Sequence, residues 1–478
     1  MAFVVGATVT GALGVARGST GPRVSVLCVV TAPIVLVVAN AMRGARPVSS
    51  QHARGGSTSP RRARRGAFLL TSGAIAVVVV AIVLLGVWEA LFAMPGLLLG
   101  ALIIDVRRSG GRLVPSRPRV WVVMVLAPLL VVSWSLVNVL APPGPDPLVI
   151  RAVEWLRDHQ GADVVNSVER WWYTSHPPPV GGAPAALEAK PRVPVSSDGR
   201  GGSRNDAPLA RVPSPTKSPV GDEGIWNAIS GSSDHPAVAT TLLRPDAVHT
   251  SLVVGLLRID PSKTRLRLLP GTEQPDGVSP NRGEVPAVDR AHLLAAFNAG
   301  FRMQEAGGGW FSEGHTATPL QAGAASLVLR DDGRADVGQW GRDDSMGPHV
   351  VGVRQNLALI VDGGVPVVGI DSPDNARWGK TLGHRVLVAR SGVGVTKDGI
   401  LIYVGGPGLS VRTLAETLIA AGAVRGMELD INTQWVDAYT FHPGVAGPAG
   451  TKLVDTMRYG PDRYLSPQSR DFISVTSR

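Results

Sequence analysis

The sequence predicts an α+β protein in which an N-terminal multi-span helical membrane anchor precedes an extracellular, mixed and mostly antiparallel α+β domain. Three observations lead to this prediction. Long uncharged apolar runs fill residues 1–141, a stretch rich in Pro, Gly and Ser covers residues 177–222, and residues 223–478 combine short β-rich runs with Asp-Gly turns and one clear helix. Strands and helices that do not alternate regularly favour an α+β domain over a parallel α/β domain.

Uncharged apolar runs in the first 141 residues have the length of membrane spans, because about 20 residues at a rise of about 1.5 Å each match a hydrocarbon core of roughly 30 Å. The run at 90–104 is shorter and contains Pro95, so it either completes a helix from its flanks or is re-entrant. The number of spans is four or five. The predicted spans cover about residues 24–42, 67–88, 90–104 and 120–141, with a weaker candidate at 2–16.

Basic residues gather in the same region. Residues 1–141 hold 14 arginines against two acidic residues, a net charge of +12, whereas the remainder is close to neutral at −2. The arginine-rich loops at 43–66 and 107–119 are predicted to be cytoplasmic by the positive-inside rule. This places the protein in the plasma membrane with its C-terminal domain outside the cell. Because the cations do not spread over that domain, nucleic acid is excluded as a partner.

Two segments are predicted to join the anchor to the domain. Residues 142–176 form a juxtamembrane amphipathic helix, since apolar residues recur at helical spacing from Leu148 to Tyr173. Its aromatic residues Trp171 and Trp172 lie either at the lipid headgroups or against the spans. Residues 177–222 contain too few large apolar residues to offset the entropy of ordering, so they are predicted to form a flexible linker.

The domain at residues 223–478 shows turn signals between β-rich runs. An Asp-Gly pair supplies the positive φ angles that a tight hairpin turn requires, and three such pairs predict three hairpins. One helix begins at the N-cap Ser410, and its apolar residues fall at i, i+3, i+4, i+7 and i+8. The predicted elements are hairpins at 325–337, 357–368 and 392–404, strands at 251–259 and 264–269, and a helix at 411–421.

Paired carboxylates are the main chemical signal. In the run 426–432, Glu428, Asp430 and Asn432 alternate with apolar residues, so on a strand they share one face. Two residues apart on a strand, the carboxylates lie roughly 6–7 Å apart at the backbone, a spacing compatible with either retaining or inverting glycosidic chemistry. Glu428 and Asp430 are therefore the predicted catalytic residues. The alternative is that they are solvated edge residues or bind neighbouring loops.

Other polar and aromatic residues occupy positions suited to substrate binding. Asn298 follows a strand-like run and precedes a turn, which would present its amide at a strand end. Arg390 would either bind phosphate through paired hydrogen bonds or neutralise a buried carboxylate such as Asp430. Trp310 follows a glycine-rich loop and would either stack on a sugar ring or anchor the loop to the core.

These residues together resemble the phosphodiester glycosidase family, over about residues 225–478. The resemblance rests on Ala296–Phe301, on Arg390–Val395 with Lys397–Gly399, on Gly408–Ser410 and on Glu428–Asp430. It implies removal of a sugar from a sugar-1-phosphodiester, and the membrane-anchored form is similar to actinobacterial members. The family's glycine-rich loop after the aspartate is replaced here by residues 431–435, which places Asn432 and Trp435 at the ligand. Phe301 completes the substrate-binding set that the resemblance implies.

The sequence thus predicts a membrane-anchored extracellular hydrolase of glycosyl (sugar-1-) phosphodiester bonds in cell-envelope glycans. The alternative is a non-catalytic glycan-binding or scaffold module of the cell wall with the same fold. The predicted partners are the membrane and a carbohydrate or glycosyl phosphodiester ligand. The single cysteine, Cys28, excludes internal disulfides and a Cys-based zinc site, and no calcium loop of recognisable spacing is present. No metal ligand is predicted, and the cofactor is left open.

Overall fold

The computed structural model divides the chain into two compact units, Met1–Pro142 and Pro143–Arg478. In the first unit only residues 134–136 are described, as a short helical piece. The second unit contains every other element discussed below. The described residues are 134–136, 148–184, 187, 209–216, 218–231, 235–275, 283–372, 376–379, 387–442 and 449–478.

The predicted multi-span helical anchor is not supported by the structure. No helix within the described ranges is both long enough and apolar enough to cross a membrane. The predicted spans at 2–16, 24–42, 67–88, 90–104 and 120–141 lie outside the described residues, apart from 134–136.

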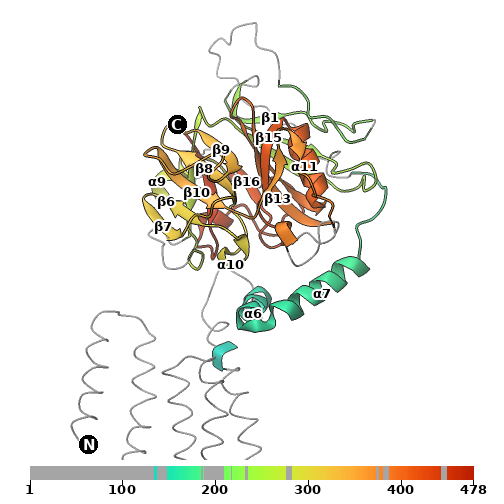
Figure 1. Ribbon diagram of the computed structural model, residues 1–478. Helices are drawn as coiled ribbons and strands as arrows, with labels where there is room; N and C mark the ends of the chain where they lie inside the picture. The colour runs from blue at the N-terminus through green and yellow to red at the C-terminus, as the bar shows by residue number, and fades with distance from the viewer. Residues whose placement is uncertain are drawn as a thin grey trace, which may run out of the picture. The chain divides into compact units, whose positions relative to one another are not determined.

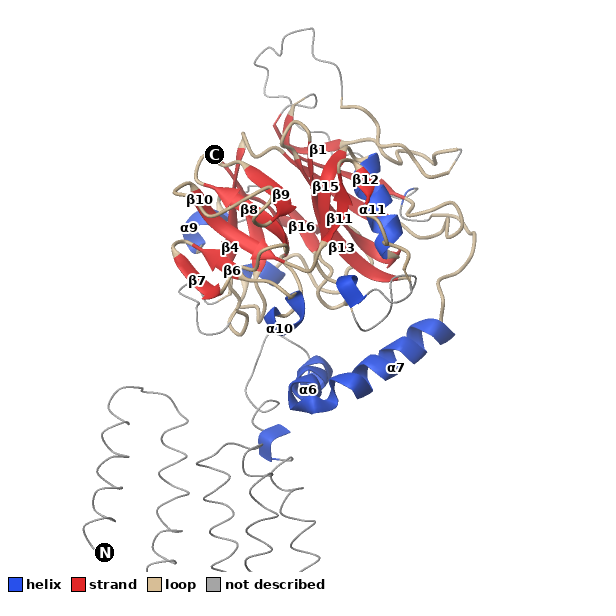
Figure 2. Cartoon of the chain, in the orientation of Figure 1, coloured by secondary structure: helices blue, strands red, loops and turns tan. Residues whose placement is uncertain are grey.

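The C-terminal domain is mostly β-structure, which corrects the predicted α+β class. Its strands form one eight-stranded sheet and two five-stranded sheets, with antiparallel pairing throughout the strand pairs described. Figure 2 shows strands filling the domain and only short helices at its edges. The class was mispredicted because several strands are buried on both faces, so their sequences are continuous apolar runs without the alternation that identifies a strand.

The eight-stranded sheet has the order β1-β2-β3-β14-β13-β15-β11-β12. Two of the predicted hairpins are found here, as β13 with β14 and β11 with β12, and the predicted strand at 251–259 is β3. The bounds are β1 Asn227–Gly231, β2 Pro236–Leu243, β3 Val254–Ile259, β11 Leu359–Asp362, β12 Val365–Pro366, β13 Val388–Thr396, β14 Leu401–Leu409 and β15 Ala423–Glu428.

The five-stranded sheets have the orders β7-β6-β10-β8-β9 and β17-β16-β5-β18-β4. The third predicted hairpin is confirmed as β8 with β9, and the predicted strand at 264–269 is β4. The bounds are β4 Thr264–Leu269, β5 Leu293–Asn298, β6 Trp310–Ser312, β7 His315–Thr318, β8 Ala325–Arg330, β9 Ala335–Gln339, β10 Val350–Gln355, β16 Ala438–His442, β17 Ala449–Lys452 and β18 Phe472–Ser477.

The helices are few and mostly short. The predicted amphipathic segment forms α6 (Leu148–Leu156), a π-helical turn (Arg157–Gly161) and α7 (Ala162–Ser175). Figure 1 shows α11 (Val411–Ala420) against β13 and β15 of the large sheet. Single turns complete the set: α9 Ala287–Arg290, α10 Met303–Ala306, and the 3-10 helices Ala376–Trp378 and Arg463–Leu465.

The predicted helix at 411–421 is confirmed, and its first turn is closed by a reciprocal cap. The Ser410 hydroxyl accepts from the Thr413 backbone N–H at 3.1 Å, and the Ser410 N–H donates to the Thr413 hydroxyl at 2.8 Å. These two bonds satisfy donors that a helix start leaves unpaired. Leu414 and Leu418 of the apolar stripe are fully buried against the sheet, and Ile419 at its end is partly buried.

The main hydrophobic core joins all three sheets. It includes Leu257 of β3, Leu294 of β5, Leu327 of β8 and Val393 of β13, each almost or completely buried. Because one core connects the sheets, the strand ends that emerge from them are held in fixed positions, and the candidate site is built from those ends.

The ordered domain begins before residue 223, within the predicted linker. Val212 is buried in the core between the large sheet and α11, and its backbone N–H donates to the Gly224 carbonyl at 2.9 Å. Next to it, the fully buried Glu223 pairs with Arg244 at 2.8 Å. Further back, the Gly181 N–H donates to the Val248 carbonyl at 2.8 Å, so the start of the predicted linker is also bound to the domain. The rest of the predicted linker, residues 185–186, 188–208 and 217, lies outside the described residues.

The Ser410 cap provides a test of this packing. We expect Ser410→Ala to lower the free energy of unfolding by about 1 kcal/mol, because it removes the side-chain acceptor of the first turn. Urea denaturation measures the change. Glu416→Ala, on the exposed face of the same helix, serves as the control and should change stability by less. Equal effects of the two substitutions would contradict the capping role.

Candidate functional site

The three sequence motifs of the predicted site meet around Ser391. The Ser391 hydroxyl accepts from the Asn298 amide at 3.0 Å and from the Asp430 backbone N–H at 3.2 Å. Its backbone N–H donates to the Asp430 carbonyl at 2.8 Å. Asn298 also accepts from the Tyr403 hydroxyl at 2.9 Å. The end of β5, the middle of β13 and the segment after β15 are therefore joined by side chains that are all buried.

Gly300, within the first motif, leaves room for a buried arginine. A Cβ atom at this position would lie 3.1 Å from the Arg354 guanidinium carbon and 3.3 Å from the Asn356 side-chain oxygen. Asn356 in turn accepts from the Phe301 N–H at 3.1 Å and donates to the carbonyls of Glu428 and Leu429. The glycine therefore allows the first motif to pack tightly beside the third.

Glu428 and Arg390 form an ion pair in the interior. Both side chains are almost completely buried, and their closest atoms, Glu428 Oε1 and Arg390 Nη1, are 2.5 Å apart. Burial raises the pKa of the Glu428 carboxyl, and the nearby Arg390 charge opposes that shift. Neither residue lines the pocket described below. Arg390 thus neutralises a buried carboxylate, as one of the two interpretations predicts, but the partner is Glu428 and not Asp430.

Asp430 pairs with a residue that the sequence analysis did not identify. Its Oδ2 atom is 2.9 Å from Arg470 Nη1, and its Oδ1 atom accepts from the Asn432 N–H at 2.9 Å. Burial raises the pKa of the Asp430 carboxyl to about 7, although Arg470 and the backbone donors act in the opposite direction. A carboxyl with this pKa exists in both protonation states near neutral pH, as proton transfer requires.

The predicted strand at 426–432 is shorter than expected. β15 ends at Glu428, and residues 427–431 are all buried. Glu428 and Asp430 therefore do not share the exposed face of one strand: Glu428 is directed to Arg390 and Asp430 to Arg470. The two predicted catalytic carboxylates have different guanidinium partners, and the structure does not bring them into one open cleft with Arg390.

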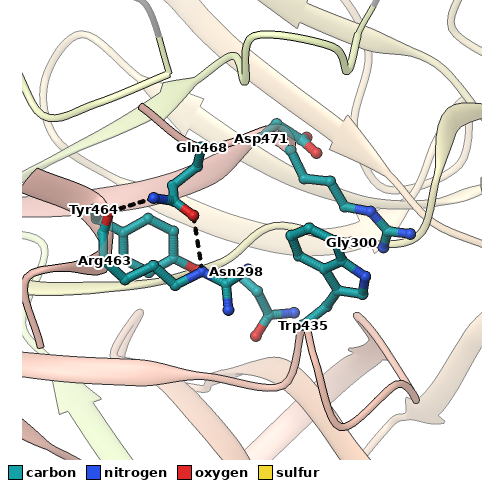
Figure 3. A pocket seen from close by; sticks show the side chains of 8 residues that line it. Asn298, Gly300, Trp435, Arg463, Tyr464, Gln468 and Asp471 are labelled. Carbon is teal, nitrogen blue, oxygen red and sulfur yellow. Dashed lines mark hydrogen bonds between the residues drawn. The ribbon is translucent and has the colours of Figure 1, made fainter. Parts of the chain in front are cut away.

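A small pocket lies next to the Asp430–Arg470 pair. The space not filled by atoms at this position is about 230 Å³, a volume that includes the open solvent at its mouth. Figure 3 shows the indole of Trp435 on one side of it and Gln468, hydrogen-bonded to Arg463, on the other. The lining residues are Asn298, Gly300, Trp435, Arg463, Tyr464, Gln468, Arg470 and Asp471.

Trp435 lies between two cations. The guanidinium carbons of Arg470 and Arg463 are 4.2 Å and 4.8 Å from the centroid of its ring. Cation–π contacts of this kind hold both partners in place. The indole is almost completely buried, so its edge, and not a free ring face, borders the pocket. The bulk that Trp435 adds to the loop therefore positions the two arginines.

Two further acid–arginine pairs support the pocket wall. Asp437 accepts from Arg463 and from the Tyr464 hydroxyl, and burial raises the pKa of its carboxyl. Asp471 pairs with the buried Arg354 at 2.7 Å. The second Asp471 oxygen, Oδ1, is buried without a hydrogen-bond partner in the structure, although Asp471 lines the pocket. This oxygen is an acceptor for a ligand group or for water.

The predicted substrate-binding residues have different surroundings. Asn298 and Trp435 line the pocket. Asn432 is partly exposed and closes the turn after Asp430, accepting from the Gln434 N–H at 2.9 Å. Phe301 packs in a hydrophobic cluster with Ile431, and Trp310 is buried in the main core. The structure thus does not bring Phe301 or Trp310 to the pocket, and for Trp310 it shows the anchoring alternative.

Several pocket residues were missed in the sequence analysis. Arg463, Gln468, Arg470 and Asp471 lie in one C-terminal segment that precedes β18. The sequence does contain a signal for these residues, because charged residues directly before an apolar run mark the end of a strand. Nothing in the sequence links Arg470 to Asp430, however, since the two residues are 40 positions apart.

The described residues contain no group of three or more His, Cys, Asp or Glu side chains arranged to hold a metal ion. The chemistry that the arrangement itself offers is proton transfer at Asp430 and anion binding at Arg470.

Comparison with known proteins agrees with the motif analysis. Residues 291–430 match the family model described as phosphodiester glycosidase, which confirms the resemblance predicted from the sequence. The chain is similar to the catalytic domain of zebrafish N-acetylglucosamine-1-phosphodiester alpha-N-acetylglucosaminidase, auto-inhibited by its pro-peptide (17% identity, 53% of this chain, 87% of that chain, TM-score 0.35). It is also similar to a hypothetical protein from Synechocystis (15% identity, 52% of this chain, 65% of that chain, TM-score 0.26). No curated protein matches the chain in sequence.

The raised pKa of Asp430 predicts how stability depends on pH. Between about pH 4 and pH 7 the folded chain keeps a proton on Asp430 that the unfolded chain loses, so this group makes the protein less stable as pH rises. We expect Asp430→Asn to abolish this pH-dependent loss of stability, because the amide does not titrate. The free energy of unfolding of the variant minus that of the wild type should therefore increase from about pH 4 to about pH 7. Urea denaturation at several pH values measures it. A constant difference would contradict the raised pKa.

Proposed function

We propose that the chain, whose residues 291–430 match the phosphodiester glycosidase family, hydrolyses sugar-1-phosphodiester bonds in glycans of the cell envelope. The observation that supports this most directly is Asp430, a buried carboxyl with a pKa of about 7 that contacts the pocket-lining Arg470. The family match supports phosphodiester glycosidase activity, and the pocket geometry suggests which residues perform it.

In the proposed reaction, water attacks the anomeric carbon and the bond from that carbon to the phosphate oxygen breaks. Asp430 in its protonated form donates the proton to the leaving phosphate oxygen. The attacking water then returns a proton to the Asp430 carboxylate, and the products are the free sugar and a phosphate monoester. A pKa near the working pH makes both transfers accessible.

Arg470 is suited to the charged part of the substrate. Its guanidinium group is planar and holds donors in a fixed fork that matches phosphate oxygens, and Trp435 covers one of its faces. In the same proposal Asn298 and the unpartnered Asp471 oxygen face the sugar, because hydroxyl groups need both donors and acceptors. Glu428 and Arg390 are given the role of a buried pair that fixes the end of β15.

The second candidate function is a glycan-binding or scaffold module without turnover. The observation that favours it is the loop at 431–435, where the family's glycines are replaced and Trp435 fills the space between two arginines. Such a module would bind the same envelope glycans through the pocket and leave them intact.

We also propose that residues 223–478 act outside the cell, at the plasma membrane. The support is the distribution of arginine in residues 1–141, which places the following chain on the outer side. Protease treatment of intact cells tests this. A tag at the C-terminus should be removed while a tag inserted in the arginine-rich loop at 43–66 is protected, and protection of both would exclude the proposal.

Asp430→Asn tests the reaction. We expect the full-length variant to lose at least 100-fold in kcat/KM against a panel of sugar-1-phosphodiesters, because an amide transfers no proton at this position. Asp398→Asn, in the exposed turn between β13 and β14, is the matched control and should retain activity. The melting temperature of both variants at pH 7 should stay within a few degrees of the wild type.

Two outcomes would contradict this assignment. Collapse of the fold in Asp430→Asn would give the residue a structural role only. Binding of the panel glycans by the wild type without any turnover would favour the glycan-binding module instead.

A further inference from the structure

The helix α6 and the π-helical turn that follows it place two carboxylates beside arginines at the candidate site. Glu154 Oε2 is 2.9 Å from Arg302 Nη1, and Glu154 Oε1 is 3.7 Å from Arg470 Nη2. Asp158, one turn further along, pairs with Nη2 of Arg302. One carboxylate group therefore lies between two guanidinium groups that come from distant parts of the sequence.

These two arginines differ from ordinary surface cations. Arg302 and Arg470 are only 7% and 8% exposed, whereas the side chains of Glu154 and Asp158 are 23% and 47% exposed. Arg302 directly follows the Asn298–Phe301 motif and precedes α10, and Arg470 is held by Asp430 and Trp435. The cations are fixed parts of the domain, and the anions come from a separate helix.

We propose that Arg302 and Arg470 form the subsite for the phosphoryl group of the ligand, and that Glu154 of α6 and Asp158 of the following π-helical turn occupy this subsite in the structure. The proposal rests on the proposed function, because it names the subsite for the charged part of that substrate. It assigns the ligand class as a phosphodiester or phosphate monoester anion attached to a sugar.

The geometry of Glu154 supports a phosphoryl ligand. Its two oxygens each face a different guanidinium group, and the two non-bridging oxygens of a phosphodiester present the same arrangement of negative charge. Guanidinium forks favour such paired oxygen acceptors. A neutral sugar hydroxyl in place of the two carboxylates would leave the guanidinium of Arg302 without a counter-charge, which its nearly buried position disfavours.

The contacts that hold α6 and α7 to the domain include several polar ones, and Tyr173 also packs against the hydrophobic cluster that contains Phe301. Arg157 approaches Glu305 of α10 at 3.9 Å and pairs with Glu169 of α7 at 2.7 Å. The Tyr173 hydroxyl is 3.1 Å from the Thr433 hydroxyl, in the loop that carries Trp435. Partly exposed ion pairs contribute little stability each, so an anion can compete with α6 for the arginines.

Binding of inorganic phosphate and of dimethyl phosphate to the full-length chain, measured by isothermal titration calorimetry, tests the subsite without requiring turnover. We expect Glu154→Gln to bind both anions at least 10-fold more tightly than the wild type, and Asp158→Asn to show a smaller gain. Glu416→Gln, an equivalent charge change on the exposed face of α11, is the control and should not alter binding. Adding Arg302→Met to Glu154→Gln should abolish the gain.

Unchanged anion affinity in Glu154→Gln, with the fold verified by circular dichroism, would overturn the proposal and leave the ion pairs as docking contacts only. A gain that survives Arg302→Met would overturn it as well. If Glu154→Gln gains affinity but no glycosyl phosphodiester is hydrolysed, the subsite stands and the proposed function fails. If hydrolysis occurs and Glu154→Gln changes neither KM nor anion affinity, the function stands and the subsite assignment fails.

Discussion

Charge matching in a low-dielectric interior is the constraint on which the site depends. Four carboxylates near the ends of β5, β15, β16 and β18 are almost completely buried, and each has an arginine within ion-pair distance. Removing a buried carboxylate from water is costly, and a guanidinium with good geometry offsets that cost. The pairs are Glu428 with Arg390, Asp430 with Arg470, Asp437 with Arg463 and Asp471 with Arg354.

The four pairs do not have the same role. Glu428–Arg390 is sealed in the interior, and Asp437–Arg463 is further satisfied by the Tyr464 hydroxyl. Asp430 keeps a raised pKa in spite of its arginine, and Asp471 keeps one oxygen without a partner. Glu428 shares both properties, because burial raises the pKa of its carboxyl and its Oε2 atom also has no hydrogen-bond partner among the described residues. What distinguishes the pairs of Asp430 and Asp471 from the Glu428–Arg390 pair is position, since Arg470 and Asp471 line the pocket and neither Glu428 nor Arg390 does.

Local signals in the sequence were sufficient for much of the fold. The Asp-Gly pairs at 332, 362 and 398 each mark a hairpin turn, and the spacing of apolar residues after Ser410 identifies α11. The class was nevertheless wrong. Strands such as β18, whose first five residues are all buried, lack the alternation that distinguishes one face from the other.

The candidate site was predicted only in part, because its residues are defined by long-range pairing. Asp430, Asn298 and Trp435 could be identified from motifs, and they do lie at or beside the pocket. The ion pair with Asp430 that was one expectation for Arg390 is made by Arg470, while Arg390 pairs with Glu428. No local sequence pattern distinguishes these two arginines. Trp310 was ambiguous for the same reason, since a loop aromatic and a core aromatic have the same sequence context.

The burial of Val212 has a practical consequence for how the protein can be cut or expressed. A proteolytic nick before residue 209 would leave the core between the large sheet and α11 complete, whereas one between Val212 and Glu223 would remove an apolar side chain from it. The same nick before residue 209 would also sever the peptide chain between the acidic helix and the arginines it contacts. Cleavage between residues 187 and 209 would therefore leave an intact domain to which α6 and α7 are held only by non-covalent contacts, namely the ion pairs of Glu154, the packing of Tyr173 and the hydrogen bonds of Gly181.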